Sequence, residues 1–408
     1  MKKLLSALLL LALCLGVCAC NSQTPTEAPT SAPTQTAAPT DTQAPTEKPT
    51  STPTEPPRIE VESTEPVYDD GEITLADRVY KLSDVTDKLK LQGRAQVLEN
   101  GIACDFTASG IAFRAYIKED LTFSVSCTKT TYFTVLKDGV RVGTRYTAGS
   151  DGVTDITVRG IGDGGVAPHE IEILKQTEPQ WSTSVLEEMS FHGQLVTKPA
   201  DKKYFIEFIG DSITCGYGNL WTPDSFAASS ASGNADYEDG TAAYAYLCAQ
   251  SLEADCSVIS CSGIGVDKGW TSFSMGDLYP KASYFRDKDT DYDFARTPDL
   301  VVINLGTNDK SRGSTEADFK AKARALIELI RTKYGEDTSI VWAYGMMGDA
   351  RCAWSKDVIS SLGGEAAGLY TVELTQNSDG GNGHPSRTAQ RYAAAELCDF
   401  LYSKNICR

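Results

Sequence analysis

The chain has 408 residues, more than one ordinary domain holds, which predicts two or three folded units with additional segments. Its 38 lysines and arginines stand against 55 aspartates and glutamates, and the formal net charge is −17. This balance excludes a nucleic-acid partner, because phosphate backbones are bound by basic surfaces. Hydrophobic residues make up 41% of the chain, so a sizeable core can be buried.

The first nineteen residues have the pattern of a secretory signal. Two lysines precede an apolar run, Leu4 to Val17, which is too short to span a bilayer comfortably. The run ends in Val-Cys-Ala-Cys, which resembles the cleavage site of a bacterial lipoprotein, and Cys20 would then be the lipid-attachment residue. Ordinary cleavage with free release is the alternative. We expect residues 1–19 to be a lipoprotein-type signal peptide and the protein to be secreted and lipid-anchored at the bacterial cell surface.

Residues 20–57 are predicted to be a disordered linker rich in threonine and proline. Ser22–Pro57 holds 9 of the 17 prolines and 11 threonines, and it has no Leu, Ile, Val, Phe, Tyr or Trp to bury in a core. Dense proline favours an extended spacer, which would hold the folded part away from the membrane. Residues 58–74 are expected to connect this linker to the first domain.

Strand signals dominate residues 75–180. Phe123–Cys127, Tyr132–Leu136 and Ile156–Val158 are rich in β-branched and aromatic residues, and glycine-containing turns separate them at short intervals. His169–Leu174 alternates apolar and polar residues as a half-buried strand does. Because no long segment here has helical periodicity, the region is predicted to be an all-β, jelly-roll-like sandwich.

From residue 200 to 408, strand and helix patterns alternate. The predicted strands are Tyr204–Ile209, Cys256–Ser260, Leu300–Leu305, Ile340–Tyr344 and Tyr370–Leu374, and the predicted helices are Ala242–Leu252, Asp318–Tyr334 and Arg387–Leu401. Such alternation is typical of a parallel sheet covered by helices. The predicted fold class is therefore two domains, an all-β sandwich followed by a three-layer α/β domain. In parallel sheets, active groups gather beyond the carboxyl ends of the strands.

Four polar or glycine-rich segments follow the predicted strands at that edge, and they contain Ser212, Gly263, Asn308 and His384. A serine hydroxyl becomes a nucleophile when a base accepts its proton, and the resulting oxyanion needs fixed hydrogen-bond donors. We expect Ser212 to be the nucleophile and His384 the general base and acid. The side chain of Asn308 and the backbone N–H groups of Gly263 and Ser212 would form the oxyanion hole.

Two of these assignments have competitors in the sequence. His384 is preferred as the base because the other histidines fall elsewhere, His169 in the predicted sandwich and His192 in the stretch between the domains. Gly265 competes with Gly263 for the oxyanion role, and a glycine at either position also suits a tight turn.

The four candidate residues match, in order, the signature of the SGNH (GDSL-type) hydrolase superfamily, which the chain resembles. The chain is more specifically similar to carbohydrate esterase family 2, on the segments Ile171–Glu178, Ile206–Gly218, Pro298–Asp309 and Val341–Met347. That family couples an N-terminal jelly roll to a C-terminal SGNH domain, which is the order of domains predicted here.

The resemblance implies an esterase that removes O-acetyl groups from polysaccharides such as xylan or glucomannan through an acetyl-serine intermediate. It implies neither a metal nor an organic cofactor. The expected partner is an acetylated polysaccharide or oligosaccharide, the membrane is contacted through the lipid anchor only, and we expect a monomer. Two alternatives stay open: an SGNH esterase acting on another acyl ester or a bacterial glycan, and a non-catalytic carbohydrate-binding protein.

One position departs from the family's pattern. SGNH enzymes usually place an aspartate three residues before the histidine, where this chain has Gly381, and many family members have Asp-Trp where Asn382 and Gly383 stand. Asp379 lies five residues upstream and would orient His384 if the glycines fold the chain back. In the alternative, which we prefer, backbone carbonyls orient the imidazole in a Ser–His dyad.

Overall fold

The computed structural model describes residues 66–222, 235–348 and 351–407. The predicted signal peptide, the whole predicted linker with the lipid-attachment residue Cys20, and residues 58–65 of the predicted connector therefore lie outside the described residues. Within these ranges, no helix is long and apolar enough to cross a membrane.

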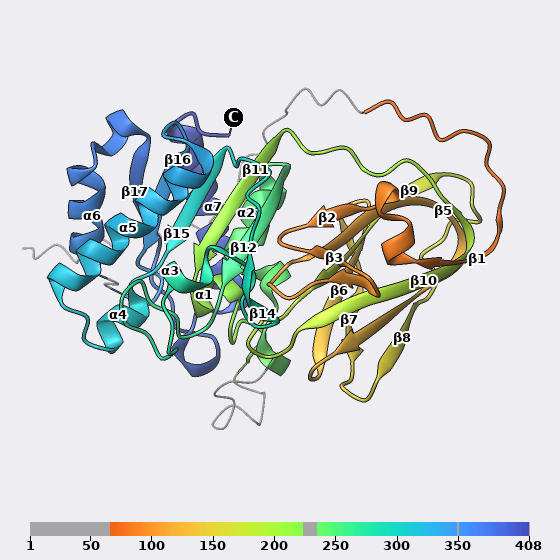
Figure 1. Ribbon diagram of the computed structural model, residues 1–408, viewed down its shortest axis with the longest axis horizontal. Coiled ribbons are helices and arrows are strands. Elements are labelled where there is room, and N and C mark those ends of the chain that lie inside the picture. Colours follow the sequence, from red (N-terminus) through yellow and green to blue (C-terminus); the bar gives the residue numbers. More distant parts are fainter. Residues whose placement is uncertain (1–65, 223–234, 349–350, 408) are drawn as a thin grey trace, which may run out of the picture. The chain divides into compact units, whose positions relative to one another are not determined.

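The first part of the described chain is an antiparallel sheet of ten strands (Figure 1). The strands are β1 (Ala76–Lys81), β2 (Lys90–Gln92), β3 (Gln96–Leu98), β4 (Gly101–Ala103), β5 (Gly110–Cys127), β6 (Thr131–Lys137), β7 (Val140–Ala148), β8 (Val153–Val158), β9 (Pro168–Lys175) and β10 (Ser184–Leu195). The long strand β5 pairs with β9 through its first half and with β8 through its second half. Its apolar side chains, such as Phe113 and Phe123, are fully buried in one core. This confirms the predicted all-β N-terminal domain.

The antiparallel sheet continues past residue 180, where the sequence pattern predicts the sandwich to end. Strand β10 pairs with β5 along most of its length and with β1 on its other side, so the sheet ends at Leu195. The placement of His192 between the domains was wrong, because this residue lies inside β10 and contacts the side chain of Asp77.

The second part is a parallel sheet of five strands in the order β12-β11-β15-β16-β17, covered by helices (Figure 1). The strands are β11 (Tyr204–Gly210), β12 (Ala254–Ser260), β15 (Leu300–Asn304), β16 (Ser339–Tyr344) and β17 (Leu369–Glu373). The longer helices are α2 (Tyr244–Ser251), α5 (Glu316–Tyr334), α6 (Cys352–Ser361) and α7 (Arg387–Ser403). Short elements fill the loops: α1 (Ser212–Cys215), α3 (Met275–Leu278), α4 (Thr307–Ser311) and the pair β13 (Lys281–Ser283) and β14 (Asp287–Asp291).

Alternation along the strands divides the core of this domain into two layers. Phe208 belongs to the cluster that contains residues of α2 and α7, whereas its neighbour Ile209 belongs to the cluster that contains residues of α5 and α6. Successive side chains of a strand point to opposite faces, so one apolar strand serves both layers. The predicted three-layer α/β domain is confirmed.

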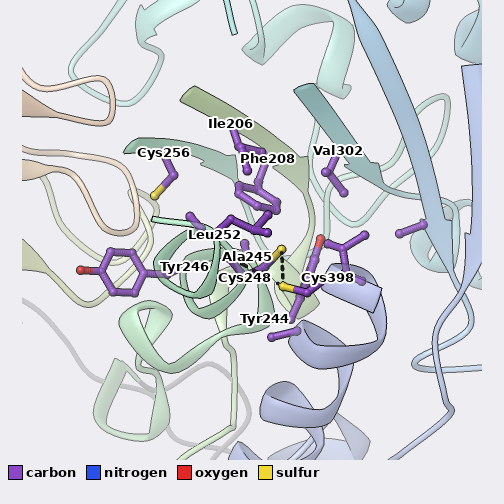
Figure 2. Packing of buried hydrophobic residues seen from close by; sticks show 14 of the residues in the cluster. Ile206, Phe208, Tyr244, Ala245, Tyr246, Cys248, Leu252, Cys256, Val302 and Cys398 are labelled. Carbon is purple, nitrogen blue, oxygen red and sulfur yellow. Dashed lines mark hydrogen bonds between the residues drawn. The ribbon is translucent and has the colours of Figure 1, made fainter. Parts of the chain in front are cut away.

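Helix α2 packs against α7 beneath the sheet (Figure 2). Phe208 and Tyr244 meet edge to face, with ring centroids 6.2 Å apart. The Sγ atoms of Cys248 and Cys398 lie 3.4 Å apart in this layer, and both thiols are buried. All cysteines in the described ranges are free thiols.

Buried polar contacts join the antiparallel and parallel sheets, which belong to one compact unit. The side chain of Arg94, 2% exposed, donates to the carbonyl oxygens of Tyr279 and Lys281 and lies 4.3 Å from the ring centroid of Tyr292. Asp105 accepts two hydrogen bonds from the guanidinium group of Arg286, at 2.7 and 2.9 Å. Because a buried charge left alone is strongly destabilising, these pairs fix how the two sheets contact each other.

Candidate active site

The turn between β11 and α1 places Ser212 at the carboxyl edge of the parallel sheet. Asp211 caps α1, and its Oδ1 accepts the N–H of Ile213 at 3.0 Å. A Cβ atom on Gly210 would lie 2.0 Å from Oγ1 of Thr214, so only glycine permits this tight exit from the strand. Ser212 is the first residue of α1 and is 6% exposed.

His384 reaches Ser212 from the loop before α7. Its Nε2 lies 2.8 Å from Oγ of Ser212, and its Nδ1 lies 3.2 Å from the carbonyl oxygen of Asn382. A carbonyl oxygen only accepts, so Nδ1 carries the proton and the lone pair of Nε2 faces the serine hydroxyl. The ring of Tyr217 packs against the imidazole, with centroids 4.5 Å apart. The structure thus brings together the predicted nucleophile and base.

The surroundings of His384 favour its neutral form. Partial burial lowers its pKa below the usual 6.5, and hydrogen bonds to the carbonyl groups of Asn382 and Gly381 oppose this shift. Burial acts this way because it disfavours the charged imidazolium. A neutral imidazole at neutral pH is the form that accepts a proton from serine.

Asp379 contacts a different partner. Its carboxylate accepts a hydrogen bond from Nδ2 of Asn377 at 2.8 Å, and its own N–H donates to Oδ1 of Asn377 at 3.0 Å. The side chain is exposed. Since Nδ1 of His384 bonds to the Asn382 carbonyl instead, the geometry favours the Ser–His dyad over Asp379 as the orienting residue.

Gly263 follows β12 and lies beside the serine turn. Its φ of +81° is left-handed, and a Cβ atom there would lie 3.0 Å from the Cβ of Trp270. Among the hydrogen bonds of the described residues, neither the N–H of Gly263 nor that of Ser212 has an acceptor. Gly265 has a packing reason for being glycine, because a Cβ atom there would lie 2.1 Å from the Lys268 carbonyl oxygen. These contacts favour Gly263 as the oxyanion donor.

Asn308 lies in α4, directly after β15, and its side chain is buried. Its Nδ2 lies 2.8 Å from the carbonyl oxygen of Ile264 and 3.2 Å from Oδ2 of Asp211. Both amide hydrogens therefore have acceptors within the protein. An oxyanion bound next to Ser212 would compete with Asp211, the more distant acceptor, for the second hydrogen.

Two buried carboxyl groups support these loops. Asp309 accepts hydrogen bonds from the three consecutive N–H groups of Val266 to Lys268, at 2.8 to 2.9 Å. Asp211 is fully buried, and this burial raises its pKa to about 7, with a further contribution from the Asp309 carboxylate. Asp211 is thus a second group beside the nucleophile that titrates near neutral pH.

Trp270 is not among the residues predicted for the site, and an isolated aromatic residue in a sequence more often packs in a core than binds a ligand. In the structure Trp270 is 68% exposed, and its backbone N–H donates to the carbonyl oxygen of Gly263 at 2.7 Å. The guanidinium carbon of Arg312 lies 4.5 Å from its ring centroid.

The described residues contain no group of three His, Cys, Asp or Glu side chains placed to hold a metal ion.

This arrangement is that of an SGNH-type acyl hydrolase, with a serine and a histidine meeting at the carboxyl edge of a parallel sheet. Residues 208–395 match the sequence profile of the GDSL-like lipase/acylhydrolase family. The α/β domain of the chain is therefore similar to this family over most of its length.

Individual relatives include carbohydrate esterases. The cellulase/esterase CelE of Acetivibrio thermocellus is 27% identical over 327 residues, which cover 75% of this chain but only 38% of that protein. An acetylxylan esterase / glucomannan deacetylase of Cellvibrio japonicus is 25% identical over 264 residues, covering 58% of this chain and 69% of that protein.

Solved structures of family two carbohydrate esterases match most of the described chain. One from Clostridium thermocellum, in complex with cellohexaose, has a TM-score of 0.71 and 25% identity, covering 78% of this chain and 100% of that chain. An acetyl xylan esterase from the rumen bacterium Butyrivibrio proteoclasticus has a TM-score of 0.71 with 20% identity, covering 81% and 100%, and therefore shares the fold. The match spans both the antiparallel and the parallel sheet.

Replacing Asp379 by alanine is expected to leave the hydrolysis of an aryl acetate within about threefold of wild type, because its carboxylate bonds to Asn377 and not to His384. His384→Ala, assayed in parallel, should lose several orders of magnitude in kcat. Removal of the orienting aspartate from a true triad lowers kcat by about 10⁴-fold. A loss of that size for Asp379→Ala would contradict the dyad.

The rate should also fall on the acid side through an apparent pKa below 6.5. Burial lowers the His384 pKa, so the neutral base is retained at pH 7 and is lost only as pH falls through the lowered value. The measurement is kcat/KM for an aryl acetate between pH 4 and pH 8, in wild type and in Asp211→Asn, which removes the other group titrating near neutrality. An acid limb centred above 6.5 that persists in Asp211→Asn would show this assignment to be wrong.

Proposed function

We propose that the protein is a carbohydrate esterase that removes O-acetyl groups from a polysaccharide of the xylan or glucomannan type. The observation that carries this proposal is the 2.8 Å contact between Nε2 of His384 and Oγ of Ser212. It occurs in a chain whose antiparallel and parallel sheets together match a family two carbohydrate esterase.

In the proposed reaction, Oγ of Ser212 attacks the carbonyl carbon of the acetyl ester while Nε2 of His384 takes the hydroxyl proton. The N–H groups of Gly263 and Ser212 and the amide of Asn308 stabilise the oxyanion. The tetrahedral intermediate collapses, and the departing sugar oxygen receives the proton from His384. Water then attacks the acetyl-serine, again with His384 as base, and acetate leaves as Ser212 is restored.

The backbone carbonyl of Asn382 takes the place of a carboxylate in this scheme. It holds the imidazole in the tautomer with the proton on Nδ1, as an aspartate would. A carbonyl carries only a partial negative charge, so it stabilises the imidazolium less than a carboxylate does. In this scheme the dyad carries out the proton transfers with less electrostatic stabilisation of the imidazolium than a triad gives.

Two features support a carbohydrate as the substrate. Trp270 presents an exposed indole beside Gly263, and the apolar faces of sugar rings pack on aromatic surfaces. The curated relatives from Cellvibrio japonicus are named acetylxylan esterase / glucomannan deacetylase.

We further propose that the mature protein is a monomer anchored to the outer face of the bacterial membrane by a lipid on Cys20. The sequence pattern of residues 1–19 supports this location, and the threonine- and proline-rich segment would serve as a spacer between the anchor and the enzyme.

The catalytic proposal is tested by acetate release from acetylated xylan, acetylated glucomannan and O-acetylated peptidoglycan. The wild type should release acetate from xylan or glucomannan, and Ser212→Ala should lose about 10⁴-fold or more in rate. Ser403→Ala, which removes a serine at the far end of α7, serves as the control. Release from peptidoglycan alone would favour an esterase of bacterial glycans. Retained glycan binding with no acetate release from any substrate would favour a non-catalytic binding protein.

Lipid attachment is tested by incorporation of radiolabelled palmitate in a bacterial host. Wild type and Cys18→Ala should be labelled and recovered with membranes, whereas Cys20→Ala should be unlabelled, because cleavage before Cys20 removes Cys18 and leaves Cys20 as the lipid-bearing first residue. Equal labelling of the Cys20→Ala variant would contradict the anchor.

A further inference from the structure

A buried carboxylate from the end of the antiparallel sheet reaches the loop that carries Gly263. Glu178 lies three residues after β9 and is 0% exposed. Its Oε2 accepts the N–H of Ser262 at 2.5 Å, and Ser262 directly precedes Gly263. The contact joins residues 84 positions apart, so it depends on the tertiary fold.

Glu178 is itself held firmly in place. Its backbone N–H donates to Oε1 of Glu238 at 2.5 Å, while Oε2 of Glu238 accepts from Nε1 of Trp181 at 2.9 Å. Nζ of Lys175 donates to the carbonyl oxygens of Thr177 and Glu178, at 2.6 and 3.1 Å. Lys175, Glu178 and Glu238 are all 0% exposed. These bonds fix the backbone at Glu178, and complete burial confines its side chain, whose Oε1 has no hydrogen-bond partner among the described residues.

Burial acts on all three ionisable groups of this cluster. Burial raises the pKa of Glu178 and of Glu238, and it lowers the pKa of Lys175 to about 8. The Ser262 N–H opposes the shift at Glu178, because a hydrogen bond to a carboxylate stabilises the charged form. A charged acceptor also makes this bond stronger than one to a neutral oxygen. Burying such groups costs free energy that apolar side chains in the same place would not cost.

We propose that Glu178 is a positioning residue for the oxyanion hole. This inference rests on the proposed function in one respect, since it takes Ser212 as the nucleophile and the Gly263 N–H as an oxyanion donor. Glu178 fixes the peptide before Gly263 by accepting the Ser262 N–H. The backbone N–H of Trp270 fixes the other side by donating to the carbonyl oxygen of Gly263 at 2.7 Å. With both sides held, the Gly263 N–H stays directed at the position where negative charge develops.

Preorganised donors of this kind act on the transition state more than on substrate binding. Glu178 touches no substrate in this account and acts only through the Ser262–Gly263 loop. The antiparallel domain would then contribute to turnover directly, in addition to any contact it makes with a glycan.

The test compares Glu178→Ala, Glu178→Gln and Glu178→Asp with a matched control, Glu172→Ala. Glu172 lies within β9, six residues before Glu178, and is 5% exposed. Burial raises its pKa as well, but its hydrogen-bond partner is Gln92. The readouts are kcat and KM for 4-nitrophenyl acetate, the Tm, and the Ki of an aryl trifluoromethyl ketone. This ketone forms a tetrahedral adduct with a catalytic serine, so its oxyanion reports directly on the hole.

Glu178→Ala is expected to lower kcat by about tenfold to a hundredfold with KM nearly unchanged, and to raise the Ki of the ketone by a similar factor. Glu178→Gln should recover most of kcat, because its amide oxygen has the reach to accept the same N–H. Glu178→Asp keeps the charge but loses the reach, so it should be slower than Glu178→Gln. Glu172→Ala should leave kcat and the Ki within about twofold of wild type, whatever its Tm.

The proposal is overturned if Glu178→Ala lowers the Tm while kcat and the ketone Ki stay at wild-type values, since Glu178 would then be structural only. If Glu178→Ala fails to fold, the order of the other two variants decides, and Glu178→Asp exceeding Glu178→Gln in kcat overturns the proposal. The aryl ester assay does not involve polysaccharide, so a wild type inactive on glycans would end the proposed function and leave this inference standing. Hydrolysis unchanged in Ser212→Ala would end both.

Discussion

The site depends on one hydrogen bond, between Nε2 of His384 and Oγ of Ser212, which are separated by 172 positions in the chain. The parallel sheet brings both ends of the domain to one edge, and a close backbone contact completes the approach. The N–H of Gly381 donates to the carbonyl oxygen of Gly218 at 2.9 Å. A Cβ atom on Gly218 would lie 2.6 Å from the Gly381 carbonyl oxygen, so the two loops approach this closely because residue 218 is glycine. This contact fixes the loop that carries His384, and the Asn382 carbonyl then orients the imidazole.

The oxyanion side of the site is built differently, from buried carboxyl groups that accept backbone N–H bonds. Asp309 holds the loop after Gly265, and Glu178 holds the residue before Gly263. The three N–H groups that donate to Asp309 replace its lost water, whereas Glu178 accepts one backbone N–H. Such groups fix a loop more rigidly than apolar packing does, since a displaced N–H would leave a buried charge unpaired. Rigid placement is what an oxyanion hole requires.

Sequence reasoning found the parts of this molecule that local patterns encode. The strand and helix periodicities predicted both sheets, and position at strand ends predicted Ser212 and His384. The sequence did not decide between Asp379 and a backbone carbonyl, because the answer depends on the left-handed conformation of Asn382, with φ at +53°. It also missed Glu178, since its partner Ser262 is distant in sequence and the contact involves a backbone N–H, which every residue except proline carries.

The dyad also gives Asp211 more influence over the site than a capping residue normally has. Asp211 titrates at about pH 7, and its Oδ2 is one of two acceptors for the Asn308 amide. When ionised, it holds that hydrogen more strongly and places a negative charge beside the developing oxyanion; when protonated, it does neither. His384 acts as a base only in its neutral form, so catalysis needs His384 deprotonated and gains from Asp211 protonated. The His384 pKa is lowered and the Asp211 pKa is raised, so both requirements are met at pH values between the two pKa values. Burial is the largest cause of both shifts, and the Asp309 carboxylate adds to the one at Asp211.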